Sequence, residues 1–93
     1  MTFELEFHEK ALKEFKVLQP NIREQFKAKL KERLRHPRVP AAKLSGHPNR
    51  YKIKLKKPPL RLVYEVVDSR VVVQVIAIGK RDRSLAYKAA AKR

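Results

Sequence analysis

The sequence predicts an α+β fold in which a strand and two helices precede three strands and a short final helix. Two observations support this prediction. Apolar residues recur at helical spacing after an alternating N-terminal segment, and alternation returns in three runs of the second half. At 93 residues the chain has room for one hydrophobic core, so residues 1–93 are expected to form a single domain.

The first half of the chain is expected to form a strand and a helical hairpin. Residues 2–7 alternate polar and apolar side chains, which is typical of a strand. Residues 8–18 place their apolar side chains on one side of a helix, and Pro20 is expected to end it. A second helix follows and ends before position 37, with Asn21 and Glu24 predicted to form a capping box at its start.

The second half is expected to hold three strands and the last helix. An ordered loop over residues 36–49 leads to strands at residues 50–56, 60–67 and 71–78, joined by short turns rich in Pro, Asp and Ser. A helix is predicted over residues 82–92. Because the sequence after its alanines is not apolar, we expect this helix to dock weakly.

The first two of these strands are predicted to form a hairpin with Leu55 opposite Leu60. This register places Lys54 opposite Arg61, with Lys52 on the same face. Like charges that face each other on adjacent strands repel. A fold that keeps these three cations together is therefore expected to use them to hold an anion.

The face of the third strand depends on the turn before it. A two-residue turn at Asp68 and Ser69 places Gln74 on the charged face and Ala77 on the apolar face. A three-residue turn reverses this, because a slip of one residue moves every side chain to the other face. The shorter turn is the preferred interpretation.

A basic cluster follows Gly79, and the strand end is expected to bring Arg81 and Arg83 near Arg61. Tyr87 lies one helical turn beyond Arg83 and can reach the same region. The expected site therefore contains four cations and one aromatic side chain. These are Lys52, Lys54, Arg61, Arg81 and Tyr87.

The charge of the chain points to a polyanionic partner. There are 24 Lys and Arg residues against nine Asp and Glu, a formal net charge of +15, and residues 50–93 carry 13 of the basic residues and three of the acidic ones. A solvated surface is the common explanation for such a run of charge, but its place on strands favours nucleic acid or an acidic protein. No apolar run is long enough to cross a membrane, so a cytoplasmic protein is expected.

The residue inventory limits the chemistry. The chain has no cysteine, and its three histidines lack partners at ligand spacing, so neither a metal, a cofactor nor a catalytic triad is expected. RNA carries its own nucleophile, the 2′-OH, and an RNase needs only a base, an acid and a cationic cradle. A lysine crowded by cations can act as the base, while arginine stays charged and binds phosphate oxygens.

Several segments resemble the RelE family of bacterial and archaeal toxins, and the similarity runs nearly from end to end. The segments are His8-Glu9-Lys10-Ala11-Leu12-Lys13-Glu14, Arg23-Glu24-Gln25, Lys43-Leu44-Ser45-Gly46, Tyr51-Lys52-Ile53-Lys54-Leu55, Arg61-Leu62-Val63-Tyr64 and Ile78-Gly79-Lys80-Arg81-Asp82-Arg83-Ser84, followed by Tyr87. Ser45 stands where close relatives are expected to have a basic residue.

The resemblance implies a microbial-RNase-like antiparallel sheet packed on two N-terminal helices. It also implies a toxin that enters the ribosomal A site and cleaves mRNA by 2′-OH attack. In that scheme Lys52 resembles the general base and Arg81 the general acid. Lys54 and Arg61 would stabilise the transition state, and Tyr87 would stack on the nucleotide.

The resemblance further implies an acidic, RelB-like antitoxin, with operator DNA bound only through the antitoxin complex. Other basic residues are expected to contact mRNA or the 16S rRNA of the ribosome. These are Lys27, Lys29, Lys31, Arg50, Lys56, Lys80 and Arg83. Two alternatives stay open: a gyrase-inhibiting toxin of the same superfamily, which would not require the five-residue site, and a non-catalytic RNA- or ribosome-binding module, for which bulk charge would suffice.

Overall fold

A computed structural model describes residues 2–81 and 85–93. The elements in chain order are β1 (Glu4–Phe7), α1 (Glu9–Lys16), α2 (Pro20–Arg35), η1 (Pro40–Ala42), β2 (Arg50–Leu55), β3 (Leu60–Val67), η2 (Asp68–Arg70), β4 (Val72–Lys80) and α3 (Leu85–Ala91). This order confirms the predicted α+β fold class. The residues at which the last helix was expected to begin, 82–84, lie outside the described part of the chain.

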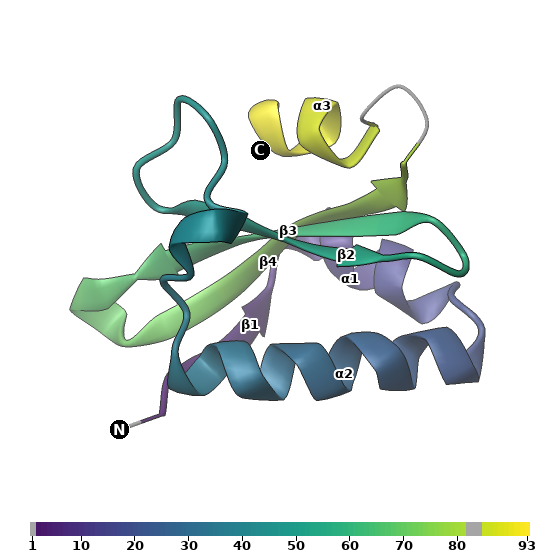
Figure 1. Cartoon of the computed structure of the whole chain (residues 1–93), viewed down its shortest axis with the longest axis horizontal. Helices are drawn as coiled ribbons and strands as arrows, with labels where there is room; N and C mark the ends of the chain where they lie inside the picture. The colour runs from purple at the N-terminus through teal and green to yellow at the C-terminus, as the bar shows by residue number, and fades with distance from the viewer. Residues whose placement is uncertain (1, 82–84) are drawn as a thin grey trace.

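The four strands form one mixed sheet in the order β1-β4-β3-β2. β2, β3 and β4 are antiparallel neighbours, whereas β1 runs parallel to β4. β1 thus departs from the antiparallel sheet that the resemblance implied, because the helices and two strands between β1 and β4 form a long connection that permits a parallel pair. α1 and α2 lie on one side of the sheet and α3 on the other (Figure 1).

The main core lies between the sheet and the two N-terminal helices. Ala11 and Phe15 of α1 are buried there, as are the three residues of α2 that recur every four positions, Ile22, Phe26 and Leu30. This spacing keeps the side chains on one stripe of the helix, as predicted. Leu12, expected on the same stripe of α1, is 37% exposed instead. No helix among residues 2–81 and 85–93 has the length and hydropathy required to span a bilayer.

The start of α2 differs from the prediction. Pro20 is the first residue of this helix, and its N-cap, Gln19, makes no side-chain capping bond. Asn21 and Glu24 lie within the helix, so the predicted capping box is wrong. Proline suits the first helical position because its φ is fixed near the helical value and the N–H that it lacks would have no intrahelical partner.

The β3–β4 connection is longer than the predicted two-residue turn. η2 occupies Asp68–Arg70, and Val71 follows in the left-handed conformation with a φ of 53°. This conformation is rare for a β-branched residue. Gln74 nevertheless lies opposite Glu65, on the charged face as predicted.

A β-bulge changes the faces at the end of β4. The register shifts by one residue between Val63 and Tyr64 of β3, which leaves Ile76 as the extra residue of β4. Ile76 and Ala77 consequently both pack on the α3 side, while Ile78 joins the main core. The prediction that placed Ala77 on the apolar face with the preceding valines is therefore wrong.

The weak docking expected for α3 is also wrong. Ala86 and Ala90 are each 1% exposed, because their small side chains let the helix lie close to the sheet. Arg50 on β2 fixes the helix end by donating to the carbonyl oxygen of Ala90 at 2.7 Å while it pairs with Glu65 at 2.9 Å. α3 is thus held both by its buried alanines and by a hydrogen bond from Arg50, a contact that the sequence of the helix itself could not predict.

Arg93 provides a second anchor beyond α3. Its guanidinium pairs with the carboxylate of Glu14 on α1 at 2.9 Å and donates to the carbonyl oxygen of Ile76 at 2.9 Å. Glu14 also accepts from the backbone N–H of Ile78 at 3.0 Å. Burial raises the pKa of Glu14, but these hydrogen bonds and the charge of Arg93 outweigh burial, so its pKa lies below the ordinary value of 4.5.

Candidate active site

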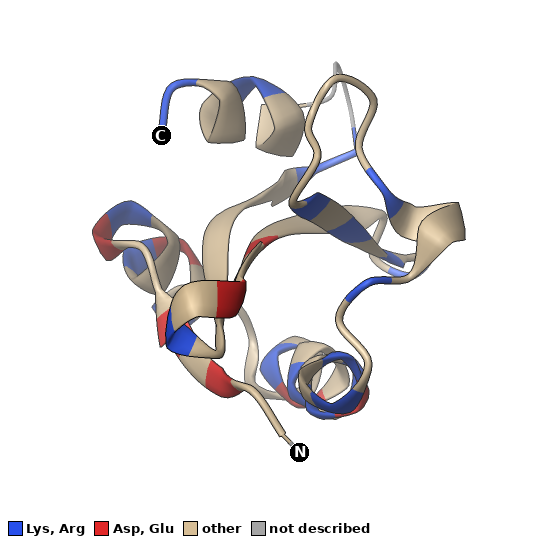
Figure 2. Ribbon diagram, turned by 90° about the vertical axis from the view of Figure 1, so that its left-hand side faces the viewer, with Lys and Arg blue, Asp and Glu red and all other residues tan. Residues whose placement is uncertain are grey.

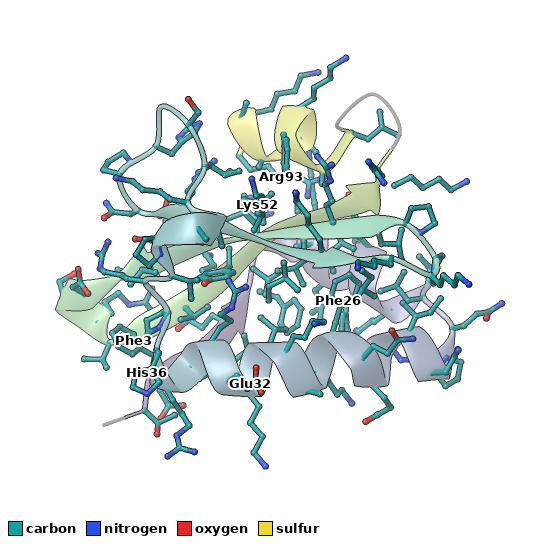
Figure 3. The ribbon with its side chains drawn as sticks, viewed as in Figure 1. Phe3, Phe26, Glu32, His36, Lys52 and Arg93 are labelled. Carbon is teal, nitrogen blue, oxygen red and sulfur yellow. The ribbon has the colours of Figure 1, made fainter. Side chains whose placement is uncertain are left out.

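The central cations of the site come from the β2–β3 hairpin. Lys54 lies directly opposite Arg61, and Lys52 lies opposite Val63, which confirms the predicted register. These cations therefore share the face of the sheet on which α3 lies, and Figure 3 shows Lys52 on that side. In Figure 2, Lys and Arg positions recur along the strand at this edge of the sheet.

The neighbouring cations change the acidity of one lysine. The charge of Lys52, followed by that of Arg61, lowers the pKa of Lys54 below its ordinary value of 10.5, and Arg81 adds a smaller effect. Lys54 is exposed, so the charge of its neighbours matters more than burial. A lowered pKa leaves more of the neutral amine near neutral pH, which is the form that can accept a proton.

Tyr87 is held over Arg61 by a close approach of α3 to β4. The guanidinium carbon of Arg61 lies 5.1 Å from the ring centroid of Tyr87, a cation–π contact. Gly79 is paired with Arg61 in the sheet, and a Cβ at this glycine would lie 3.1 Å from the backbone nitrogen of Ala86. The absence of a side chain at Gly79 thus lets α3 begin close to the strand.

Two polar atoms of this contact have no hydrogen-bond partner. Among the buried side-chain atoms of residues 2–81 and 85–93, only the Nε of Arg61 and the hydroxyl of Tyr87 are unpaired. Leaving such a group unpaired costs about 1–3 kcal/mol, and native proteins rarely do so without a reason. Both atoms belong to residues that the sequence placed in the site.

Arg81 is fixed at the tip of the hairpin. Its backbone N–H donates to the carbonyl oxygen of Pro59 at 2.9 Å, one residue beyond the end of β4. Its side chain lines a hollow of about 400 Å³ together with Lys54, Lys56 and Arg61. The structure thus brings together the cations that the sequence placed near one another.

Lys52 lies in an adjoining hollow of about 320 Å³, which it shares with Lys54 and with Arg33 of α2. Sequence reasoning did not single out Arg33. Its Nη1 donates to the carbonyl oxygen of Lys52 at 3.2 Å and to the hydroxyl of Tyr64 at 2.9 Å. Arg33 stands three positions after the buried Leu30, and residues at this spacing lie on the same face of a helix. This spacing could have predicted that the aliphatic part of the Arg33 side chain lies near the core.

The other predicted RNA contacts are divided between the site and more distant surfaces. Lys56 lines the hollow of Arg81, and Lys80 lies with Arg81 in a neighbouring hollow of about 650 Å³ at the hairpin tip. The side chain of Arg50 is only 14% exposed and is engaged with Glu65 and α3. Arg50 therefore acts as a structural anchor whose guanidinium is already engaged within the protein.

Three predicted contacts lie on α2, on the side of the sheet away from α3 (Figure 1). These α2 lysines are Lys27, Lys29 and Lys31, and all are exposed. They are not brought into the hollows that hold the central cations. Ser45 lies exposed in the loop before β2, and Arg83 lies outside the described residues.

The described residues contain no cluster of three or more His, Asp or Glu side chains that could hold a metal ion. His8 instead caps α1, where its Nδ1 accepts from the backbone N–H of Lys10 at 3.1 Å. The polar side chains that line the hollows are amines and guanidinium groups, and the phenol ring of Tyr87 lies against one of these, Arg61.

Comparisons with known proteins place this site in a family. Residues 5–85 match the family model described as the ParE toxin of the type II toxin–antitoxin system parDE. The whole chain is 53% identical to the mRNA interferase toxin RelE of Escherichia coli strain K12, of which it covers 98%.

Solved structures agree with this relationship. A mutant of the E. coli toxin RelE in the free state is 50% identical and superposes with a TM-score of 0.92, covering 100% of this chain and 98% of that one. The intact RelBE toxin–antitoxin complex of E. coli gives a TM-score of 0.83 at 52% identity, covering 87% of this chain and 99% of the matched one. The chain belongs to the RelE toxins of the ParE/RelE toxin family.

Proposed function

We propose that this protein is an mRNA interferase, a toxin that cleaves mRNA in the ribosomal A site and so inhibits translation. The observation that carries the proposal is the placement of four cations around two adjoining hollows at one edge of the sheet, with an aromatic ring against one of them. The cations are Lys52, Lys54, Arg61 and Arg81, and the ring is that of Tyr87. The name of the E. coli relative, mRNA interferase toxin, supports the same reading.

The chemistry is attack by the 2′-OH of the RNA on its own adjacent phosphate. The base takes the 2′-OH proton as the new O–P bond forms, and the bond from phosphorus to the 5′ oxygen breaks. Arg81 gives a proton to the departing 5′ oxygen, leaving a 2′,3′-cyclic phosphate and a 5′-OH. Arg61 stabilises the charge that develops on the phosphate oxygens, and Tyr87 stacks on the nucleotide.

The assignment of the base changes from Lys52 to Lys54 in this proposal. Lys54 lies in the same hollow as Arg61 and Arg81, whereas Lys52 lines the adjoining one. The pKa of Lys54 is also lowered, with the charge of Lys52 as the largest cause. Lys52 then binds phosphate, and its charge lowers the pKa of Lys54.

The inferred partners are the ribosome, mRNA and an acidic antitoxin similar to RelB. A formal net charge of +15 favours all three, because each is polyanionic. The matched RelBE complex supports the antitoxin, and operator DNA is expected to be bound only through that complex. Such a protein works in the cytoplasm, where its ribosomal target is.

Primer extension on an mRNA in stalled ribosomes tests the proposal. The protein is expected to produce a cut within the A-site codon, whereas the same mRNA without ribosomes stays largely intact at that position, because the ribosome must align the 2′-OH. Comparable cutting of the naked mRNA would show that the ribosome is not required. Inhibition of gyrase supercoiling without any cut would favour the gyrase-inhibiting alternative.

A further inference from the structure

Four hollows along the edge of the sheet follow one another, and each shares at least one lining residue with the next. A hollow of about 480 Å³ at the end of α2 shares Arg33 and Val39 with the hollow that contains Lys52. That hollow shares Lys54 with the next, which in turn shares Arg81 with the hollow at the hairpin tip. The cationic surface is thus longer than the five-residue site and extends past it toward α2.

Arg33 is held rigidly at the α2 end of this series. Its Nη1 donates two hydrogen bonds, one to the carbonyl oxygen of Lys52 on β2 and one to the hydroxyl of Tyr64 on β3. These bonds tie α2 to the sheet beside the hollow that contains Lys52. Tyr64 donates in turn to the carbonyl oxygen of Pro37 at 2.6 Å. The guanidinium carbon also lies 5.7 Å from the centroid of the Tyr64 ring. A guanidinium fixed in this way loses little further freedom when it binds a ligand.

The rest of the Arg33 guanidinium is available for a ligand. Its Nε and Nη2 have no hydrogen-bond partner among the described residues, and no carboxylate there pairs with it. The hollow that it lines is completed by Lys52 and Lys54 on one side and by three small apolar residues. These are Val39, Ala41 and Ala42. A hollow lined by both cations and apolar side chains suits a nucleotide, which has an anionic phosphate and a flat, largely apolar base.

We propose that the hollow between Arg33 and Lys52 binds the RNA nucleotide that adjoins the cleaved linkage. Arg33 contacts the phosphate of this nucleotide, and the surface at Val39 and Ala41 supports its base. The inference rests on the proposed function, because it assumes that RNA occupies the adjoining hollow lined by Lys54, Arg61 and Arg81. An RNA strand that reaches from Arg81 past Lys54 would enter this hollow next, since the two hollows share Lys54.

Binding of a non-cleavable RNA by the isolated protein tests the inference without relying on cleavage. The probe is a fluorescein-labelled 2′-O-methyl hexanucleotide, and its anisotropy gives the dissociation constant across a salt series. Arg33→Gln is expected to weaken binding about five- to tenfold and to reduce the slope of log K against log salt by about 0.7, the value for one phosphate contact on a single strand. Lys13→Gln is the matched control, since it removes one exposed charge on α1.

A scan with single neutral methylphosphonates locates the contact. Neutralising one particular linkage of the RNA should weaken its binding to the wild type but should not weaken binding to Arg33→Gln any further. A second linkage should show the same pattern with Arg81→Gln, and the two linkages should be neighbours in the RNA. Arg33→Lys should keep the salt slope, which separates the loss of charge from a loss of folding. Equal weakening by Arg33→Gln and Lys13→Gln, or no linkage coupled to Arg33, would overturn the inference even if ribosomal cleavage were observed.

The same assay distinguishes RNA from a peptide occupant. Polyglutamate binding that depends on Arg33, together with RNA binding that does not, would assign the hollow to an acidic peptide and overturn the proposal. Arg33-dependent RNA binding without any cut on ribosomes would uphold the nucleotide site and refute the proposed activity.

Discussion

If Lys54 is the base, its pKa should depend on the charge of Lys52, and this dependence can be read from the pH–rate profile. The two residues stand two positions apart on β2, so their backbones are separated by about 7 Å. This is comparable with the Debye length of about 8 Å at physiological ionic strength, so salt screens their repulsion only in part. The charge of Lys52 is the largest cause that lowers the pKa of Lys54.

Lys52→Gln removes that charge, and the pKa of Lys54 should rise toward 10.5. Below its pKa, the neutral fraction of an amine increases with pH, so the rising limb of the profile should move to higher pH and the rate at pH 7 should fall. Lys52→Arg keeps the charge and should leave the limb in place. Lys54→Arg removes a base that can deprotonate near neutral pH, and should lower the rate by about 10²-fold or more across the range.

The assay is single-turnover cleavage on programmed ribosomes at saturating toxin, from pH 6 to 9. Raising the salt concentration provides an internal control, because screening should shrink the difference between the wild type and Lys52→Gln. If Lys54→Arg cleaves at the wild-type rate while Lys52→Arg loses about 10²-fold, the base is Lys52, as the resemblance to the RelE family implied. The fold and the toxin family would be unaffected by that result.

Two further predictions concern the elements that hold the site. Gly79→Ala should push α3 away from β4 by a few tenths of an ångström, because the new Cβ would meet the backbone of Ala86. The resulting displacement of Tyr87 should lower the cleavage rate about tenfold. An unchanged cleavage rate would show that the close approach of α3 to β4 is not needed. Glu14→Gln should destabilise the protein by about 1–2 kcal/mol at pH 7. Since the folded pKa of Glu14 is depressed, its contribution is full above pH 4.5 and is lost as the pH falls through the folded pKa, so thermal unfolding of the variant and of the wild type should converge in acid.

The sequence predicted those parts of the site that depend on strand periodicity. A period of two is enough to place Lys52, Lys54 and Arg61 on one face, and the hairpin register followed from the short connection at Pro58-Pro59. These relations are local, because residues that alternate along one strand, or face each other across a tight turn, need no knowledge of the rest of the fold.

The parts that the sequence did not predict depend on contacts between distant segments. The bulge at Ile76 decides which residues of β4 lie beneath α3, and no pattern of apolar residues marks it. Arg33 was not singled out from the sequence, although it reaches Lys52 of β2, 19 residues further along the chain. Arg50 was expected to contact RNA but ties α3 to the sheet, and Arg93, which was likewise not singled out, ties the chain beyond α3 to α1. Each of these three arginines bridges elements that lie close together only in the tertiary fold.

The distribution of ion pairs explains why the site stays cationic. Within residues 2–81 and 85–93 the structure contains five ion pairs, and none of them includes Lys52, Lys54, Arg61 or Arg81. The acidic residues that form these pairs neutralise other cations, such as those that anchor α3. The four site cations therefore repel one another in the free protein, and a polyanion that enters the hollows relieves this repulsion. RNA and an acidic antitoxin segment would both gain from that relief. The two are therefore expected to compete for the hollows, so that binding of one excludes the other.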